Sequence, residues 1–170
     1  MCIFNGVDGG GLGEGFSDFA ALALRIKPTD TRDTDYGIAE WYLNAGPGGI
    51  RGYPYSTSFE TNPTSFDLLN TDAYAGVHMS GMVWANLLYD MLWRFIEKKG
   101  YVQELRPQFD QGTFGPVPRG GRNYVVKLVL DAMKLMPCGP SMLDARDAII
   151  DAEYTLTAGQ NLCQIWTAFT

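Results

Sequence analysis

The longest regular pattern in this sequence is an apolar repeat that runs from residue 79 to residue 99. Large apolar side chains recur in it at intervals of three and four residues, at Val83, Trp84, Leu87, Leu88, Met91, Leu92, Phe95 and Ile96. This spacing places them on one face of an α-helix. Gly100 follows the pattern directly, and glycine is a common residue at the end of a helix. The repeat therefore predicts a long helix with one buried face.

Four further segments carry weaker helical patterns. They are residues 12–26, 123–136, 141–152 and 162–169. The first ends before Pro28 and the second at Pro137, because a proline pushes the residue before it out of the helical region. Ser141 with Asp144 three residues later is a weak capping box at the start of the third. Since the regular patterns are helical, the predicted fold class is mainly α.

Glycines dominate the start of the chain, and its first ten residues are predicted to be irregular. Gly13 and Gly15 lie in the first turn of the helix predicted at residues 12–26, where they weaken it. Glycines at such positions suggest that another part of the backbone approaches closely there.

Between the first and second long helices, residues 28–75 are predicted to be mostly irregular. Within this segment we expect one short helix around residues 35–44, a turn cluster at residues 45–49 and extended chain over residues 51–55. An irregular segment of this length is uncommon unless it lines a site or is disordered. Its aromatic residues disfavour disorder, so we expect it to line a site.

The chain has 170 residues, of which 46% are hydrophobic, and this suits one compact domain with a buried core. The net charge of -6 argues against nucleic acid or an anionic membrane as a partner. No apolar run is long enough to span a membrane. The first residues lack a basic segment followed by an apolar stretch, so no signal peptide is predicted.

The three cysteines leave two interpretations open. In an oxidising compartment Cys138 and Cys163 could form a disulfide, which would leave Cys2 unpaired. In a reducing compartment all three would be buried or unreactive thiols. Their spacing matches no zinc or redox motif.

Two carboxylates stand four residues apart near the start of the chain, at Glu14 and Asp18. On a helix this spacing puts both on one face, one turn apart. A metal site can use such a pair, with one carboxylate binding the cation and the other orienting a neighbouring ligand. Two alternatives are a solvated acidic face and a favourable interaction of Glu14 with the helix N-terminus.

His78 is the only histidine, and it lies at the entrance to the long helix. Its imidazole can donate a hydrogen bond to a developing oxyanion, although a lone histidine is often a surface or capping residue. Arg51 is a fixed cation in a turn-rich loop, where it could bind a substrate carbonyl or carboxylate, or form a surface ion pair.

Seven short segments match one protein family in order along nearly the whole chain. They are residues 13–19, 31–36, 49–58, 77–78 with 83–85, 135–138, 145–152 and 163–167. Together these segments resemble the fungalysin family, which consists of fungal extracellular zinc metalloproteinases related to thermolysin. The resemblance implies a secreted zinc metalloendopeptidase that is made as a zymogen and acts on protein or peptide substrates.

The resemblance also implies roles for the four candidate residues. Glu14 corresponds to the third zinc ligand, and Asp18 to the acid that accepts a hydrogen bond from a zinc-bound histidine. His78 corresponds to the histidine that stabilises the oxyanion during peptide hydrolysis. Arg51 matches an arginine that contacts a substrate carbonyl oxygen.

The family's His-Glu-x-x-His helix has no counterpart in this sequence. In the family that helix lies upstream and supplies two zinc ligands and the general base. Residues 1–170 are therefore expected to be a single domain that forms the helical C-terminal part of a protease catalytic domain, with signal, propeptide and first half absent. One carboxylate does not hold a catalytic zinc, so we predict that this polypeptide alone is inactive and needs a complementing N-terminal half.

A non-catalytic function is the alternative. The chain would then be a helical fragment or binding module derived from the protease, with an exposed hydrophobic face that binds a partner. The resemblance implies an extracellular location, although the chain has no recognisable signal peptide of its own.

Overall fold

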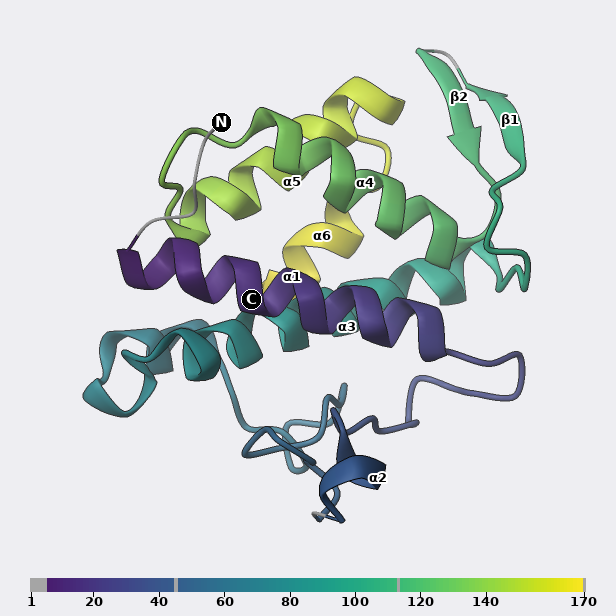
Figure 1. The fold of residues 1–170 in the computed structure, drawn as a ribbon. Coiled ribbons are helices and arrows are strands. Elements are labelled where there is room, and N and C mark those ends of the chain that lie inside the picture. The colour runs from purple at the N-terminus through teal and green to yellow at the C-terminus, as the bar shows by residue number, and fades with distance from the viewer. Residues whose placement is uncertain (1–5, 45, 113, 170) are drawn as a thin grey trace.

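The computed structural model of the chain describes residues 6–44, 46–112 and 114–169. The described elements are α1 (Gly6–Arg25), α2 (Glu40–Leu43), η1 (Phe66–Asn70), η2 (Asp72–Tyr74), α3 (Val77–Lys99), β1 (Phe109–Gly112), β2 (Gly115–Pro118), α4 (Gly121–Leu135), α5 (Met142–Thr157) and α6 (Leu162–Phe169). Most of them are helices (Figure 1), so the predicted mainly α fold class is confirmed. Within the described ranges no helix is both long and apolar enough to cross a membrane.

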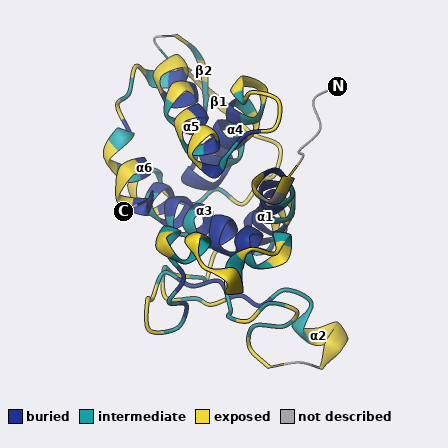
Figure 2. Ribbon diagram, turned by 90° about the vertical axis from the view of Figure 1, so that its left-hand side faces the viewer, coloured by how far each residue is buried: buried dark blue, intermediate teal, exposed yellow. Residues whose placement is uncertain are grey.

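Helix α3 lies at the centre of the fold. α1, α4 and α6 pack against it, and α5 packs against α4 (Figure 1). The apolar repeat predicted for this helix forms its buried face, where Trp84, Leu88, Leu92 and Phe95 are fully buried. α3 begins at Val77, two residues before the predicted start. Figure 2 shows buried residues on the facing sides of the helices, whereas α2 projects from the molecule and is exposed.

Helix α1 is longer than the sequence predicts. It begins at Gly6, so the predicted irregular start is wrong for residues 6–10, while residues 1–5 lie outside the described part. The reason is packing against α3, because Gly11 is buried and a Cβ there would lie 2.3 Å from Ser80 Oγ. This tertiary contact outweighs the low intrinsic helix propensity of glycine.

α1 and α3 approach most closely at Gly15 and Gly81. A Cβ on Gly15 would lie 2.7 Å from the carbonyl oxygen of Gly81, and a Cβ on Gly81 would lie 2.7 Å from the Cβ of Glu14. A Cβ on Gly13 would meet nothing within 4 Å. The predicted close approach is therefore confirmed at Gly15 and is wrong at Gly13.

The segment between α1 and α3 contains little regular structure, as predicted. The short helix expected around residues 35–44 is present only as the four residues of α2. The short 3-10 helices η1 and η2 are not predicted from sequence. Residues 51–53 form bends rather than extended chain, but Tyr55 is extended and pairs with Tyr36 in an antiparallel bridge. This bridge fixes the loop beside α1.

The helices predicted in the second half are confirmed with shifted ends. α6 has the predicted bounds, whereas α5 runs five residues further than predicted, to Thr157. The capping box at the start of α5 is formed, since the Asp144 N–H donates to Ser141 Oγ at 3.1 Å and the Ser141 N–H donates to Asp144 Oδ2 at 2.9 Å. The β1–β2 hairpin is not predicted, because its residues are mostly exposed and lack an alternating apolar pattern.

The proposed disulfide between Cys138 and Cys163 is wrong. Cys163 is a free, exposed cysteine on α6, whereas Cys138 is disulfide-bonded. The buried face of α6 is formed by Ile165, Ala168 and Phe169, so the helix turns Cys163 towards solvent. Sequence spacing does not reveal this orientation.

Candidate functional site

The four residues singled out by sequence lie together in one cluster. Glu14 and Asp18 are one turn apart on α1, His78 is in the first turn of α3, and Arg51 belongs to the loop that follows α2. The close approach of Gly15 and Gly81 brings the first turn of α3 beside Glu14. Three segments that are far apart in the sequence therefore meet at this point.

Glu14 contacts two basic side chains of the cluster, His78 and Arg51. Its Oε2 atom lies 2.8 Å from His78 Nδ1 and 3.2 Å from Arg51 Nη2. The Glu14 side chain is 36% exposed and the His78 side chain 69% exposed. The hydrogen bond with His78 is the largest influence that holds the pKa of Glu14 below its usual value; burial opposes it and Arg51 adds to it. Glu14 is therefore ionised at neutral pH.

Asp18 is buried and receives hydrogen bonds on both oxygens. Arg51 Nε lies 2.7 Å from Oδ2 and Arg51 Nη2 lies 3.0 Å from Oδ1, which is a bidentate ion pair. The Tyr55 hydroxyl donates a third hydrogen bond to Oδ2. A buried carboxylate requires such partners, because an unpaired charge in the interior is costly.

Arg51 joins the two carboxylates. Its side chain is only 9% exposed, and Nη2 donates to Asp18 and to Glu14. Burial alone would lower the pKa of Arg51, but the hydrogen bond and charge of Asp18 outweigh burial and raise it. The predicted contact between Arg51 and a substrate carbonyl stays a prediction, since Nε and Nη2 are already bound to carboxylates.

Tyr55 is a member of the cluster that sequence reasoning missed. It is fully buried, and its hydroxyl donates to Asp18. Burial is the main cause that raises the pKa of Tyr55, and the charge of Asp18 raises it further, so the hydroxyl stays protonated. The one sequence signal that could have pointed to Tyr55 is its place within residues 49–58, which carry part of the family resemblance.

The cluster does not form a metal site by itself. No group of three or more His, Cys, Asp and Glu side chains placed to hold a metal ion occurs among the described residues. Catalytic zinc takes three protein ligands. Asp18 is engaged by Arg51 and Tyr55, so the described residues offer at most the carboxylate of Glu14, whose Oε1 atom makes no hydrogen bond within the described part.

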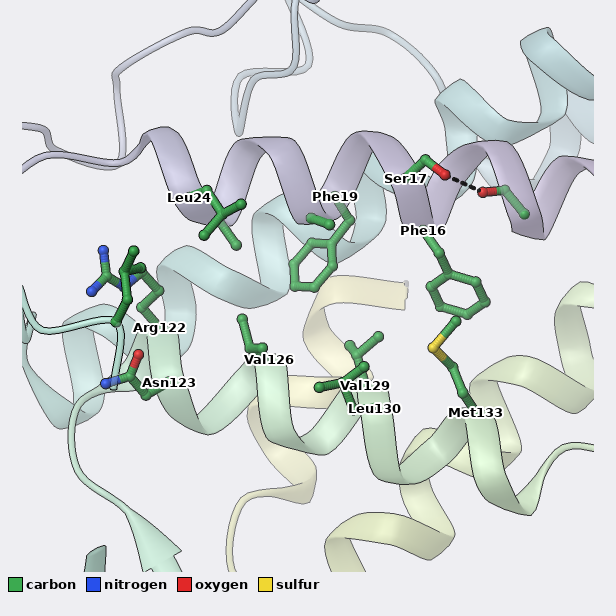
Figure 3. A pocket seen from close by; sticks show the side chains of 14 residues that line it. Phe16, Ser17, Phe19, Leu24, Arg122, Asn123, Val126, Val129, Leu130 and Met133 are labelled. Carbon is green, nitrogen blue, oxygen red and sulfur yellow. Dashed lines mark hydrogen bonds between the residues drawn. The ribbon is translucent and has the colours of Figure 1, made fainter. Parts of the chain in front are cut away.

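An apolar groove of about 520 Å³ lies between α1 and α4 (Figure 3). One end is formed by Gly13 and Ser17, on either side of Glu14 in the sequence, and the other end by Arg122 and Asn123. Its walls are the apolar residues Phe16, Phe19, Ala20, Ala23, Leu24, Val126, Val129, Leu130 and Met133, with Leu105. The groove therefore gives the molecule an accessible hydrophobic surface between α1 and α4.

The comparisons with known proteins agree with one another. The model of the Fungalysin metallopeptidase (M36) family matches residues 1–170. The chain is 48% identical over 165 residues to the extracellular metalloproteinase mep of Aspergillus fumigatus and to extracellular metalloproteinase 10 of Coccidioides posadasii, each match covering 97% of this chain. It is also 48% identical over 164 residues to extracellular metalloproteinase 2 of Trichophyton tonsurans, covering 96% of this chain.

These matches cover only 25% of the length of each relative. The family is shown by a model that spans the whole sequence and by relatives that share nearly half of its residues. This chain belongs to the fungalysin family of metallopeptidases.

Proposed function

We propose that this chain supplies part of the catalytic site of a secreted zinc metalloendopeptidase, which hydrolyses internal peptide bonds of proteins. The observation that carries the proposal is the convergence of Glu14, Asp18, Arg51 and His78 from three separate segments. These are the residues to which the family resemblance gives roles. Secretion is supported by the names of the relatives, which are called extracellular metalloproteinases.

Glu14 is proposed as one zinc ligand, with its free Oε1 atom available for the metal. His78 is the most exposed of the four residues, and its imidazole is proposed to donate to the oxyanion that forms on the substrate carbonyl. Arg51 binds both carboxylates and is proposed to hold them in place. The proposed role of Asp18 is to accept a hydrogen bond from a zinc-bound histidine that lies outside these residues.

The 170-residue polypeptide by itself is proposed not to hydrolyse peptides, because a catalytic zinc requires three protein ligands and the described residues hold no group of three placed to bind a metal ion. Purified polypeptide with added zinc should show no turnover of an internally quenched peptide. Addition of the part of the Aspergillus fumigatus relative that lies outside the match should restore turnover that a chelator abolishes. Turnover by the pure 170-residue polypeptide that a chelator abolishes would contradict this proposal.

The role of Glu14 is tested in the complemented enzyme. Glu14→Gln should lower kcat/KM by about 100-fold or more, because an amide is a poor zinc ligand. Glu60→Gln is the matched control, since Glu60 is an exposed glutamate that has no proposed role in the site. Equal activity of the two variants would contradict the assignment of Glu14.

A second candidate function is a non-catalytic binding module, and the apolar groove between α1 and α4 favours it. In this case Val126→Asp, which puts a charge into the groove, should abolish binding of the complementing polypeptide or another partner. Glu14→Gln should leave that binding unchanged. Loss of peptidase activity in Glu14→Gln with unchanged binding would separate the catalytic function from the binding function.

A further inference from the structure

Among the described residues, the Tyr55 hydroxyl is the one uncharged hydrogen-bond donor to the ion pair of Asp18 and Arg51. Tyr55 is fully buried, and its hydroxyl donates to Oδ2 of Asp18. Arg51 Nε donates to the same oxygen at 2.7 Å. The carboxylate of Asp18 is thus held from two sides by residues of one loop, four positions apart.

The backbone at Tyr55 is fixed on both sides. The Tyr55 N–H donates to the carbonyl of Tyr36 at 2.8 Å, and the Tyr36 N–H donates to the carbonyl of Tyr55 at 3.0 Å. The next residue is tied to α3, because the Ser56 N–H donates to Asn86 Oδ1 at 3.1 Å. The Tyr55 ring therefore enters the cluster from a backbone that cannot shift freely.

Contacts continue from Asp18 to the far side of the cluster. Arg51 Nη2 lies 3.0 Å from Asp18 Oδ1 and 3.2 Å from Glu14 Oε2, so one nitrogen binds both carboxylates. If the carboxylate of Asp18 rotates, the guanidinium of Arg51 loses its bidentate geometry and its direction towards Glu14.

We propose that Tyr55 is a positioning residue of this site: its hydroxyl fixes the Asp18 carboxylate, which orients Arg51 and, through Arg51, Glu14. The proposal rests on the proposed function for the importance of Glu14. The contact chain itself lies within the described residues. Burial and the charge of Asp18 raise the pKa of Tyr55, so the hydroxyl remains a donor throughout the neutral range.

The test compares Tyr55→Phe with Tyr36→Phe in the 170-residue protein. Both changes remove one tyrosine hydroxyl and keep the ring, and Tyr36 donates its hydroxyl to Asp30 instead of Asp18. The readout is hydrogen exchange of the Arg51 Nε–H group in ¹⁵N NMR spectra, with the signal assigned by its loss in Arg51→Lys. Tyr55→Phe should speed this exchange about tenfold or more, because hydrogen bonds to charged groups are the strong ones.

Tyr36→Phe should leave the Arg51 exchange rate unchanged, even where it lowers stability. Equal exchange rates in Tyr55→Phe and the wild-type protein would overturn the proposal and leave Tyr55 as a packing residue. If Tyr55→Phe does not fold, the proposal is tested instead by the exchange rate of the Tyr55 hydroxyl proton in the wild-type protein. Slow exchange of this proton supports the proposal, and exchange as fast as that of an exposed tyrosine overturns it.

This measurement needs neither metal nor catalysis. If the complemented enzyme is inactive but Tyr55→Phe speeds the exchange of Arg51 Nε–H as expected, only the proposed function is contradicted. If the complemented enzyme is active but Tyr55→Phe leaves the exchange rate of Arg51 Nε–H unchanged, only the positioning role of Tyr55 is contradicted.

Discussion

Two buried carboxylates of this protein are stabilised in different ways. Asp18 has a cationic partner, since Arg51 forms a bidentate ion pair with it. Glu153, which is fully buried, is bound by neutral donors: the Tyr124 and Thr157 hydroxyls and two nitrogens of Asn161.

The difference follows from what each carboxylate connects. Glu153 on α5 accepts hydrogen bonds from Tyr124 on α4, from Thr157 at the end of α5 and from Asn161 in the turn before α6, so it acts as a structural junction. Asp18 joins α1 to a loop, and its cation also reaches the partly exposed Glu14. Because Arg51 binds both the buried Asp18 and the partly exposed Glu14, it links the interior to the candidate site. Burial alone therefore does not mark a functional acid.

The largest loss of stability is expected from removal of the Arg51 guanidinium. Arg51→Met leaves the carboxylate of Asp18 buried without a counter-charge, and should lower the free energy of unfolding by about 3–5 kcal/mol at neutral pH. Arg119→Met is the matched control, because Arg119 pairs with Asp110 on the surface. The control should cost less than about 1 kcal/mol. Urea unfolding measures the stability of both variants. Equal losses of unfolding free energy would contradict the stabilising role of the Arg51–Asp18 ion pair.

A smaller effect is expected where α1 meets α3. Gly81→Ala places a Cβ 2.7 Å from the Cβ of Glu14 and 2.8 Å from the carbonyl oxygen of Gly11. This overpacking should cost about 1–3 kcal/mol and separate Glu14 from His78. Gly13→Ala meets no atom within 4 Å and should stabilise α1 by about 0.5–1 kcal/mol. Thermal unfolding of the two variants should therefore shift in opposite directions; a shift of both to lower temperature contradicts the packing argument.

Replacement of the other buried carboxylate, Glu153, tests whether its role is structural only. Glu153→Gln keeps the shape of the side chain but turns one acceptor oxygen into a donor, which faces the donor groups of Asn161 and Thr157. Loss of these hydrogen bonds should lower the free energy of unfolding by about 1–2 kcal/mol. The exchange rate of Arg51 Nε–H should stay unchanged. A change in that rate would show that the junction and the site are coupled.

The smallest effect concerns the exposed end of the cluster and its pH dependence. The pKa of Glu14 is lowered, so its contribution to stability is present above its usual value of 4.5 and is lost as the pH falls through the lower, folded-state value. His78→Ala removes the main cause and should raise the Glu14 midpoint measured by carboxyl ¹³C NMR. Because Glu14 is partly exposed, the change in stability should stay below about 1 kcal/mol. An unchanged midpoint would mean that Arg51 alone sets the pKa of Glu14.

Prediction from sequence worked where the signal is local. The apolar repeat of α3, the capping box of Ser141 and Asp144, and the placement of Glu14 and Asp18 on one helical face all depend on residues a few positions apart. It failed at the start of α1, at the β1–β2 hairpin and at Cys163, where packing or pairing partners decide the conformation. Residue type and spacing singled out the four site residues and the family resemblance gave them roles, but neither gave the distances between them.

Short stretches of chain were enough to predict most of the helices, the family and most residues of the cluster, because periodicity, capping and motifs depend on residues that are close in the sequence. The folded structure was needed to see that Arg51 binds both carboxylates and that the hydroxyl of Tyr55, 37 residues after Asp18, donates to Asp18. Side chains that far apart have no fixed relation until the helices pack. Their hydrogen bonds therefore become visible only in the folded molecule.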